Sequence, residues 1–519
     1  MANPLFQLVI TFLVSVGAFF YFKRRASRFP LPPGLAGLPI LGNVFQIPDS
    51  FEWITYHKWS KQLETDILYL NVAGQAMIVL DTAQVASDLL DKRSSIYSSR
   101  PRFPMLNELS GGTFNTGTMK YGMRQHRQLF HQYFGPNSPS NYKPHVTRAA
   151  RNLLNKVLDD PQKLKEHLRY MAGDVIMSIC YGLDVSSERG SSYLKVVEKG
   201  VQSIIEAGVP GRFLVDALPI LKYIPEWVPG AAFQRKAREW KHCTQDMLTL
   251  PFQATKQQVA AGTCPPCFTC DSLQKFDANS GPMNVNSSDN FVKNTAGTMY
   301  MAGSDTTVAA LASCILGLLG RPDVLKRARA DLDRVIEPGH LPDLDDMPSL
   351  PFITAIAKEA LRWRDVTPIG LPHYVEVEDE YRGYRIPAGS VLIANCWAML
   401  HDESVYPSPF LFKPERFMNG DALNPDVKDP DHACFGFGRR ICAGRFVAFP
   451  SIWITIASLI YVFEIEREVD ENGCEIDPQP EYTSGIVVSP KPFPCNIKPR
   501  SPDFVQLIRE NLHKNLEDL

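Results

Sequence analysis

The stretch FGFGRRICAG, residues 435–444, surrounds a single cysteine, Cys442, with glycines, arginines and phenylalanines. A buried structural thiol would explain Cys442 alone, because free cysteine is among the most buried residue types. It would not explain the neighbours, since glycine lets a backbone approach a flat group closely and arginine is the preferred partner of carboxylates. A thiolate on a tight loop beside such a guanidinium is typical of an axial ligand to haem iron. The stretch therefore predicts a haem site at Cys442.

Composition narrows the class of protein. The 519 residues are 45% hydrophobic and 21% charged, with a formal net charge of -2. This balance indicates a globular core and gives no sign of nucleic-acid binding, so we expect no nucleic-acid partner. The 11 cysteines are odd in number and mostly scattered. This is unlike a disulfide framework and favours a reducing compartment.

The beginning of the chain has the composition of a membrane span. Residues 4–22, PLFQLVITFLVSVGAFFYF, carry no charge and are long enough to cross a bilayer core as a helix. Four basic residues follow within the next six positions, which places the rest of the chain in the cytosol by the positive-inside rule. A cleaved signal peptide is the alternative, but no basic residue precedes the apolar run and no clear cleavage site follows it.

Three segments follow from this reading. We expect residues 1–22 to be a transmembrane anchor and residues 23–40 to be a basic, proline-rich linker, with PLPPGLAGLP as a stiff spacer. Residues 41–519 then form the cytosolic body of the protein.

The body of the chain is predicted to be mainly α-helical with a small β region. Residues 66–81 read as two short strands that turn at Ala73-Gly74, and residues 375–395 read as a second group of strands. Residues 262–288 are rich in Gly, Pro, Ser and Asn, so we expect a loop there.

A second informative string, AGSDTT at residues 302–307, lies in a long apolar helix predicted over residues 288–320. Asp305 and Thr306 are poor helix formers, and burying an acid costs free energy unless it is paired. One reading is a threonine that bonds back to a carbonyl one turn earlier. The other is an acid beside an alcohol that relays protons. The residues alone leave both readings open.

A third pattern joins two distant segments. In KEALR, residues 358–362, Glu359 and Arg362 share one face of a helix and would contribute only about 0.2 to 0.5 kcal/mol as a surface pair. FKPERF, residues 412–417, offers Arg416 as a second guanidinium for Glu359.

Together these stretches resemble the cytochrome P450 family. FGFGRRICAG fits that family's haem-loop pattern F-x-x-G-x-R-x-C-x-G in full. AGSDTT, the Glu359–Arg362 pair and PERF occur in the family's order and approximate spacing. The resemblance runs from about residue 30 to about residue 500, and it implies that residues 41–519 form one haem-thiolate monooxygenase domain. It implies the cytochrome P450 fold, mainly α with a smaller β region, preceded here by one N-terminal transmembrane helix.

The resemblance also implies a cofactor and the residues that hold it. The cofactor would be haem b, iron protoporphyrin IX, with its metal bound by the thiolate of Cys442. Five further residues would support it: Arg440 and His373 at the two propionates, Phe435 near the sulfur, and Gly438 and Gly444 where the loop approaches closely. Asp305 and Thr306 would be catalytic, whereas Glu359, Arg362 and Arg416 would form a buried ion network that braces the fold.

One position departs from the family. The helix reading YGMRQHRQLFH, residues 121–131, has Met123-Arg124 where the family usually has Trp-Arg. We expect Arg124 still to serve a haem propionate, and Arg127 is the second candidate.

A competing signal is CPPCFTC, where Cys264, Cys267 and Cys270 recur at every third residue. Such spacing occurs in iron–sulfur and zinc sites. A closed metal site needs a fourth ligand, and only His242 and Cys243 are near in sequence. We expect three reduced thiols on a surface loop, with a metal site as the alternative.

The function implied by the resemblance is a monooxygenase that inserts one oxygen atom from O2 into a lipophilic small molecule. The chain lacks a G-x-G-x-x-G nucleotide-binding fingerprint. Electrons would therefore come from NADPH–cytochrome P450 reductase, with cytochrome b5 as a further donor, docked where Arg439, Arg440 and Arg445 concentrate positive charge. The alternatives are a haem-thiolate isomerase or dehydratase that needs no reductase, and a non-catalytic haem sensor.

The sequence is least informative about the substrate. Residues 215–237 and the haem loop resemble fungal members that act in secondary metabolism, such as the O-methylsterigmatocystin oxidoreductase-like group. Such members oxidise polyketides, terpenoids and indoles, so the resemblance does not choose among these scaffolds. It implies a single-pass protein of the endoplasmic reticulum membrane with its catalytic domain in the cytosol.

Overall fold

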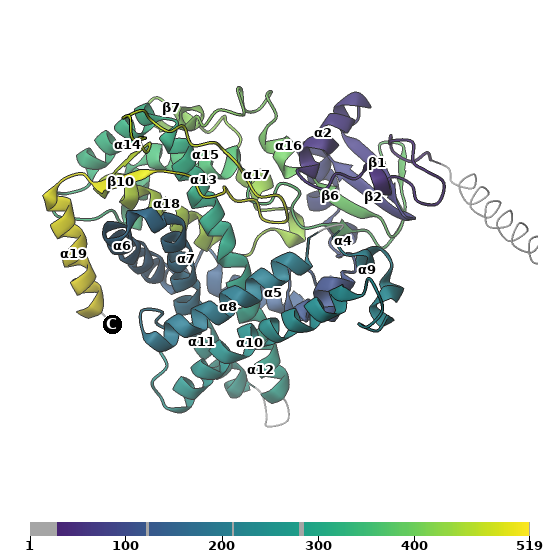
Figure 1. Ribbon diagram of the computed structural model, residues 1–519, viewed down its shortest axis with the longest axis horizontal. Helices are drawn as coiled ribbons and strands as arrows, with labels where there is room; N and C mark the ends of the chain where they lie inside the picture. Colours follow the sequence, from purple (N-terminus) through teal and green to yellow (C-terminus); the bar gives the residue numbers. More distant parts are fainter. Residues whose placement is uncertain (1–28, 121–123, 210–211, 280–284, 518–519) are drawn as a thin grey trace, which may run out of the picture.

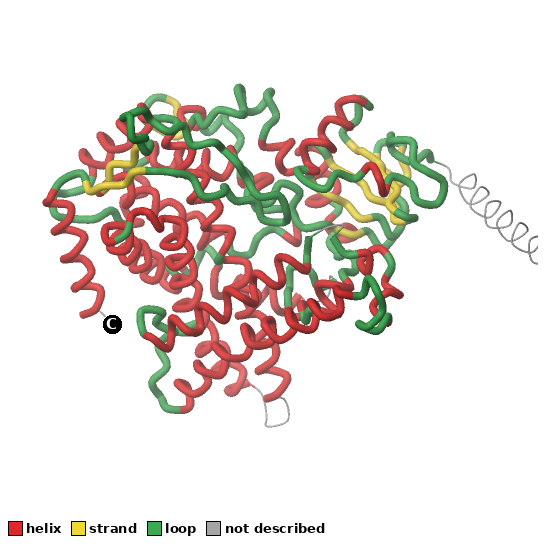
Figure 2. The backbone as a smooth tube through the Cα atoms, viewed as in Figure 1, coloured by secondary structure: helices red, strands yellow, loops and turns green. Residues whose placement is uncertain are grey.

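Helices dominate the structure, a computed structural model that describes residues 29–120, 124–209, 212–279 and 285–517 (Figures 1 and 2). The predicted mainly α fold with a small β region is confirmed. The predicted anchor, residues 1–22, lies outside the described residues. The helices are α2 (Glu52–Gln62), α3 (Ala83–Ala86), α4 (Ser94–Tyr97), α5 (Arg124–Phe134), α6 (Lys143–Asp159), α7 (Leu164–Tyr181), α8 (Glu188–Ala207), α9 (Leu214–Ala217), α10 (Ala232–Ala260), α11 (Phe268–Asn279), α12 (Val285–Gly303), α13 (Asp305–Leu319), α14 (Pro322–Val335), α15 (Pro351–Trp363), α16 (Cys396–Leu400), α17 (Asp431–Cys434), α18 (Arg445–Val462) and α19 (Pro502–Glu517).

The largest sheet lies at one end of the molecule (Figure 2) and has the strand order β1-β2-β6-β3. Its first two strands form the predicted hairpin, which turns at Ala73 and Gly74, both with positive φ. Strand β6 pairs in parallel with β2, and β3 pairs with β6, so this sheet joins both predicted groups of strands and holds His373 at its edge. The strands are β1 (Ile67–Val72), β2 (Gln75–Leu80), β3 (His373–Tyr374) and β6 (Val391–Ala394).

Three two-stranded sheets complete the β region of the described chain. They pair β4 (Asp379–Tyr381) with β5 (Tyr384–Ile386), β7 (Met418–Asn419) with β8 (Ala422–Leu423), and β9 (Phe463–Glu466) with β10 (Asn496–Pro499).

The described part of the predicted linker belongs to the folded body. The amide of Tyr69 on β1 donates to the carbonyl of Pro33 over 2.8 Å, and Gly34 forms a β-bridge with Tyr69. A Cβ atom on Gly34 would lie only 2.1 Å from the Tyr69 carbonyl oxygen, so glycine is required for this approach. The proline-rich segment therefore lies against the sheet.

The prediction of a loop over residues 262–288 is wrong for most of this segment. Helix α11 occupies Phe268–Asn279 and α12 begins at Val285. Phe268 and Leu273 are buried in the core. Burial of apolar side chains there outweighs the weak local preference of Ser and Asn for loops.

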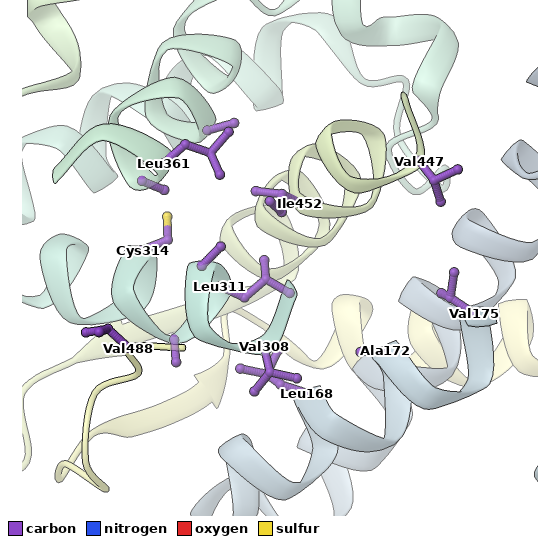
Figure 3. Close-up of a cluster of buried hydrophobic side chains, with 14 of the residues drawn as sticks. Leu168, Ala172, Val175, Val308, Leu311, Cys314, Leu361, Val447, Ile452 and Val488 are labelled. Carbon is purple, nitrogen blue, oxygen red and sulfur yellow. The ribbon is translucent and has the colours of Figure 1, made fainter. Parts of the chain in front are cut away.

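The core forms where four helices meet, α7, α13, α15 and α18 (Figure 3). Leu168 of α7 lies next to Val308 of α13, and Leu311 of α13 lies near Ile452 of α18 (Figure 3). This packing fixes α18, which starts three residues after Cys442, against the helix that carries Thr306.

Two described helices are long and apolar enough to cross a membrane, Ser288–Leu319 and Arg445–Val462. They are 78% and 72% buried inside the fold, so they are core helices.

Candidate active site

Short contacts hold the cysteine loop between α17 and α18. The amide of Cys442 donates to the carbonyl of Phe435 over 2.7 Å and closes the loop. Gly438 has a φ of 51°, and a Cβ atom there would lie 2.1 Å from the carbonyl oxygen of Leu90. The amide of Gly438 donates to the carboxylate of Asp91 over 2.6 Å. Glycine is thus required at 438 because the loop packs directly on the neighbouring backbone.

The Cys442 side chain is exposed to open space on one side. Protein atoms crowd its other sides, and the resulting desolvation raises the pKa of its thiol, opposed by the Gly444 backbone and by Arg127. A Cβ atom on Gly444 would lie 4.0 Å from the sulfur. Arg445 donates to the carbonyl of Cys442 over 2.9 Å. The loop therefore presents one fixed sulfur to a space that a ligand can occupy.

Three buried basic residues lie beside this loop. Arg100 donates to the carbonyls of Gly117, Leu371 and Pro372, and Arg440 donates to those of Ser98, Thr116 and Met119. Burial lowers the pKa of Arg100, and the charges of Arg440 and Arg127 lower it further. Burial lowers the pKa of His373, and the charges of Arg100 and then Arg440 lower it further. Positive charge concentrated in this way favours a ligand that brings carboxylates.

The ring of His373 is oriented by the backbone. Its Nδ1 lies 2.8 Å from the carbonyl oxygen of Tyr97, so Nδ1 carries a proton and donates it. Nε2 is left for a second partner. A carboxylate at Nε2 would offset the repulsion by the guanidiniums and favour the doubly protonated ring.

The long apolar helix is broken at Ser304, between α12 and α13. The hydroxyl of Thr306 donates to the carbonyl of Ala302, one turn earlier, over 2.8 Å. Ala302 is exposed and Thr306 is half-buried although the helix crosses the core. The local hydrogen bond is thus present, and the break leaves the threonine beside accessible space.

Asp305 makes a different set of contacts. Its carboxylate lies 3.6 Å from Nε of Arg169 on α7. Both line a polar pocket of about 420 Å³ with Glu198 of α8. Tyr300 and Ser304 also line this pocket, and their buried hydroxyls have no hydrogen-bond partner among the described residues. Unsatisfied buried hydroxyls beside a polar pocket are typical sites for ordered water.

Comparison with known proteins decides the family. The family described as Cytochrome P450 matches residues 32–497. Cytochrome P450 monooxygenase 98 of Postia placenta is 39% identical over 504 residues, which cover 96% of each chain. A cytochrome P450 monooxygenase of Armillaria gallica is 40% identical over 495 residues, 94% of this chain and 96% of the relative. The tryptamine 4-monooxygenase of Psilocybe cyanescens is 36% identical over 508 residues, 96% of this chain and 99% of the relative.

The chain belongs to the cytochrome P450 family. It is a haem-thiolate monooxygenase, an oxidoreductase whose cofactor is protoporphyrin IX haem. P450 monooxygenases in general take electrons from redox-partner reductases and act on lipophilic substrates. The predicted family, enzyme class and cofactor are therefore confirmed.

The residues of this P450 fit a haem. Haem combines a flat apolar ring, an iron that accepts a thiolate and two carboxylates. The sulfur of Cys442 borders open space, and Arg100, Arg440 and His373 supply the basic groups for the carboxylates. Sequence reasoning missed Arg100, because an arginine before a proline looks like any loop residue and only burial distinguishes it.

The two arginines near the start of α5 differ in position. Arg127 donates to the carbonyl of Ile441, next to Cys442, over 2.6 Å. Arg124, preferred from the sequence, is exposed and lines a surface pocket together with Arg127. The contact with the P450 cysteine loop thus comes from Arg127. Met123, which stands in place of the usual Trp, lies outside the described residues.

The ion network predicted from KEALR and PERF is confirmed. Glu359 and Arg362 are 0% exposed. The carboxylate of Glu359 accepts from Arg362 at 2.7 and 2.8 Å, from Arg416 at 3.1 Å and from the amide of Lys413 at 2.7 Å. Arg362 also donates to the carbonyl oxygens of Leu400 and Pro409. The network fastens α15 to the segment before the P450 haem loop.

Proposed function

We propose that this monooxygenase inserts one oxygen atom from O2 into a lipophilic small molecule of fungal secondary metabolism, with a terpenoid, polyketide or indole scaffold. The observation that carries the reaction type is the sulfur of Cys442, which faces open space beside a buried group of basic residues. The similarity to a tryptamine 4-monooxygenase supports an indole as one candidate scaffold.

Each residue of the site has a proposed part. Cys442 holds the iron, while Arg440, Arg100 and His373 hold the propionates, with Arg127 and Arg124 at the edge of the same region. Haem, when bound, supplies the iron at which O2 is reduced and split. Phe435 closes the loop by accepting from the Cys442 amide, and Gly438 and Gly444 keep the loop narrow.

Proton supply is proposed for Asp305 and Thr306. Insertion of one atom of O2 releases the other as water, which consumes two protons. Asp305 borders the polar pocket with Arg169, and Thr306 borders the accessible space at the helix break. A carboxylate that exchanges protons with water in this pocket can resupply the threonine hydroxyl.

Replacement of Thr306 by alanine tests this path. We expect product formed per NADPH consumed to fall severalfold and hydrogen peroxide to rise, because O2 reduced without the second proton leaves as peroxide. Haem content should not change, since alanine favours helix more than threonine does. The matched control is Thr307→Ala, because Thr307 also bonds back one turn, to Gly303 over 3.1 Å, but is buried. An unchanged ratio in Thr306→Ala would mean that the hydroxyl serves only its local hydrogen bond.

We propose that NADPH–cytochrome P450 reductase, with cytochrome b5 as a second donor, docks on a cationic face beside the cysteine loop. A pocket of about 590 Å³ there is lined by Arg124, Arg127, Gln128, His131, Arg439, Ile441, Ala443 and Arg445. Positive charge steers association with an acidic donor surface, and salt screens this attraction. The rate of reduction by the reductase should therefore fall severalfold between low and high ionic strength. A rate independent of salt would contradict a docking site of this charge.

We propose that residues 1–22 anchor the chain in the endoplasmic reticulum membrane. The catalytic domain, residues 41–519, then lies in the cytosol together with the linker segment that packs against it. A second contact is proposed from exposed apolar side chains at one end of the molecule. They include Ile40 and Phe45 near the first strand, and Leu214, Ile220 and Trp227 in and after α9. Figure 1 shows α9 and strand β1 at the same end. Large exposed apolar side chains that cluster mark membrane or protein contacts.

Removal of residues 1–22 should lower the fraction of protein in the membrane pellet without loss of haem. Adding Ile220→Ser and Trp227→Ser should lower that fraction further, because two apolar contacts are lost. Leu411→Ser in the truncated chain is the control, since Leu411 is also exposed but lies outside this group. Equal release by the control and by the double substitution would contradict the second contact.

A further inference from the structure

Three clustered cysteines, Cys264, Cys267 and Cys270, lie outside the haem site at the turn between α10 and α11. Figure 1 shows α11 beside α10 and α12, away from the end that carries β1. The expected surface loop is only partly correct, because Cys267 and Cys270 are 0% and 4% exposed while Cys264 is half-buried. Across the described ranges, no group of three or more His, Cys, Asp or Glu side chains is arranged to hold a metal ion. The chemistry to consider is that of the thiols themselves.

The first two cysteines form a C-x-x-C pair that ends at a helix N-terminus. Cys267 directly precedes α11, and its sulfur accepts from the amide of Cys270 over 3.4 Å. The thiol of Cys264 lies 3.4 Å from the carbonyl of Pro265. Gln274 donates to the sulfur of Cys270 over 3.5 Å. The amide at the helix start therefore fixes the position of the Cys267 sulfur.

Burial and hydrogen bonding give the three thiols different roles. The neighbouring thiol of Cys267, and then that of Cys270, lowers the pKa of the Cys264 thiol to about 7, against the effects of burial and of Asp271. The neighbouring Cys264 and burial raise the pKa of Cys267. Burial raises the pKa of Cys270 to about 11. Cys264 is therefore the most accessible of the three thiols and the one whose pKa is lowered.

We propose that Cys264 and Cys267 form a reversible thiol–disulfide site that a hydroperoxide oxidises. The thiolate of Cys264 attacks one oxygen of hydrogen peroxide, and the O–O bond breaks. Hydroxide leaves, and a sulfenic acid is formed at Cys264. The sulfur of Cys267 then attacks that of Cys264, and the S–O bond breaks. The proton of Cys267 leaves with the departing hydroxide as water. Two thiols and one peroxide give one disulfide and two waters.

The geometry selects Cys267 rather than Cys270 as the partner. A disulfide needs Cα atoms about 4.4 to 6.8 Å apart, and the chain bends at Pro266 between Cys264 and Cys267. Cys267 is fixed at the helix start, whereas Cys264 precedes the helix and can approach it. Cys270 lies within the first turn of α11, where Gln274 holds its sulfur.

The test uses the reduced full-length holoprotein and added hydrogen peroxide. After oxidation, iodoacetamide and trypsin, one tryptic peptide, residues 257–275, contains all three cysteines. We expect it to lose two hydrogens and to accept one alkyl group, at Cys270. Reduction by dithiothreitol should restore three alkylated cysteines. A peptide that keeps three alkylated cysteines after peroxide, or a disulfide that leaves Cys264 free, would overturn the proposal.

A second readout compares alkylation rates before oxidation. Cys474 is an exposed cysteine in the same chain and serves as the internal reference. At pH 7 a pKa near 7 raises the thiolate fraction about fifteenfold over that of an ordinary thiol. The more acidic thiol gives a weaker nucleophile, which lowers the alkylation rate about fivefold. Cys264 should therefore be alkylated about threefold faster than Cys474. An equal or slower rate at Cys264 would contradict its role as the attacking thiolate.

Single substitutions separate the roles. Cys264→Ser should abolish the disulfide, whereas Cys270→Ser should leave it intact. Loss of the disulfide in Cys270→Ser would overturn the pairing with Cys267. The wild-type peptide map decides the proposal even where a variant fails to fold.

Discussion

Replacement of Cys442 by serine is expected to abolish monooxygenase activity and the thiolate-type Soret band of the reduced, carbon monoxide-bound protein. A serine hydroxyl is far less acidic than a thiol and remains neutral, so it does not replace a thiolate that donates electrons to iron. The loop should keep its shape, because its closing bond joins the backbone amide of Cys442 to Phe435. The measurement is the carbon monoxide difference spectrum with haem content assayed alongside.

Cys434→Ser provides the matched control for this change. Cys434 ends α17, eight positions before Cys442, and is half-buried. Its replacement should leave the thiolate-type band in place. A thiolate-type band that persisted in Cys442→Ser, or that vanished in Cys434→Ser alone, would refute the assignment of Cys442 as the iron ligand.

The second large effect is expected from Glu359→Gln. The glutamine keeps the shape of the side chain but removes the charge that faces Arg362 and Arg416. Two buried guanidiniums would then repel each other without a carboxylate between them. Removing one partner of a buried ion pair costs about 3 to 5 kcal/mol. The midpoint of thermal unfolding and the rate of haem loss would report this destabilisation.

An exposed glutamate pair supplies the control for that substitution. Glu481 pairs with Lys491 over 2.9 Å, and both side chains are more than half exposed. Glu481→Gln should scarcely change the unfolding midpoint, because water solvates the remaining charge. Equal midpoints for the two variants would mean that the buried network does not brace the fold.

Residues whose role depends on local pattern could be predicted from the sequence. The loop around Cys442 carries its chemistry within ten residues, and the hairpin between β1 and β2 is specified by the turn residues Ala73 and Gly74. The pairing of Glu359 with Arg416 spans distant segments, so the residues offered it only as a candidate and the family resemblance supported it.

Other features depend on contacts that the sequence does not display. Arg100 is one arginine among many until tertiary packing buries it beside Arg440 and His373. Helix α11 forms in a segment of loop-like composition because Phe268 reaches the core. Asp305 and Thr306 are neighbours, but successive helical residues point about 100° apart. The structure accordingly turns Asp305 towards Arg169, while Thr306 borders the helix break.

The reaction itself is tested most directly by following the oxygen atoms. The full chain would be produced with its reductase in a host that makes candidate terpenoid, polyketide and indole precursors, under O2 labelled with heavy oxygen. We predict a metabolite, absent from the Cys442→Ser host, that gains one labelled oxygen atom and forms only with NADPH and reductase. A product formed without reductase, or one whose new oxygen comes from water, would contradict the monooxygenase reaction and favour an isomerase or dehydratase.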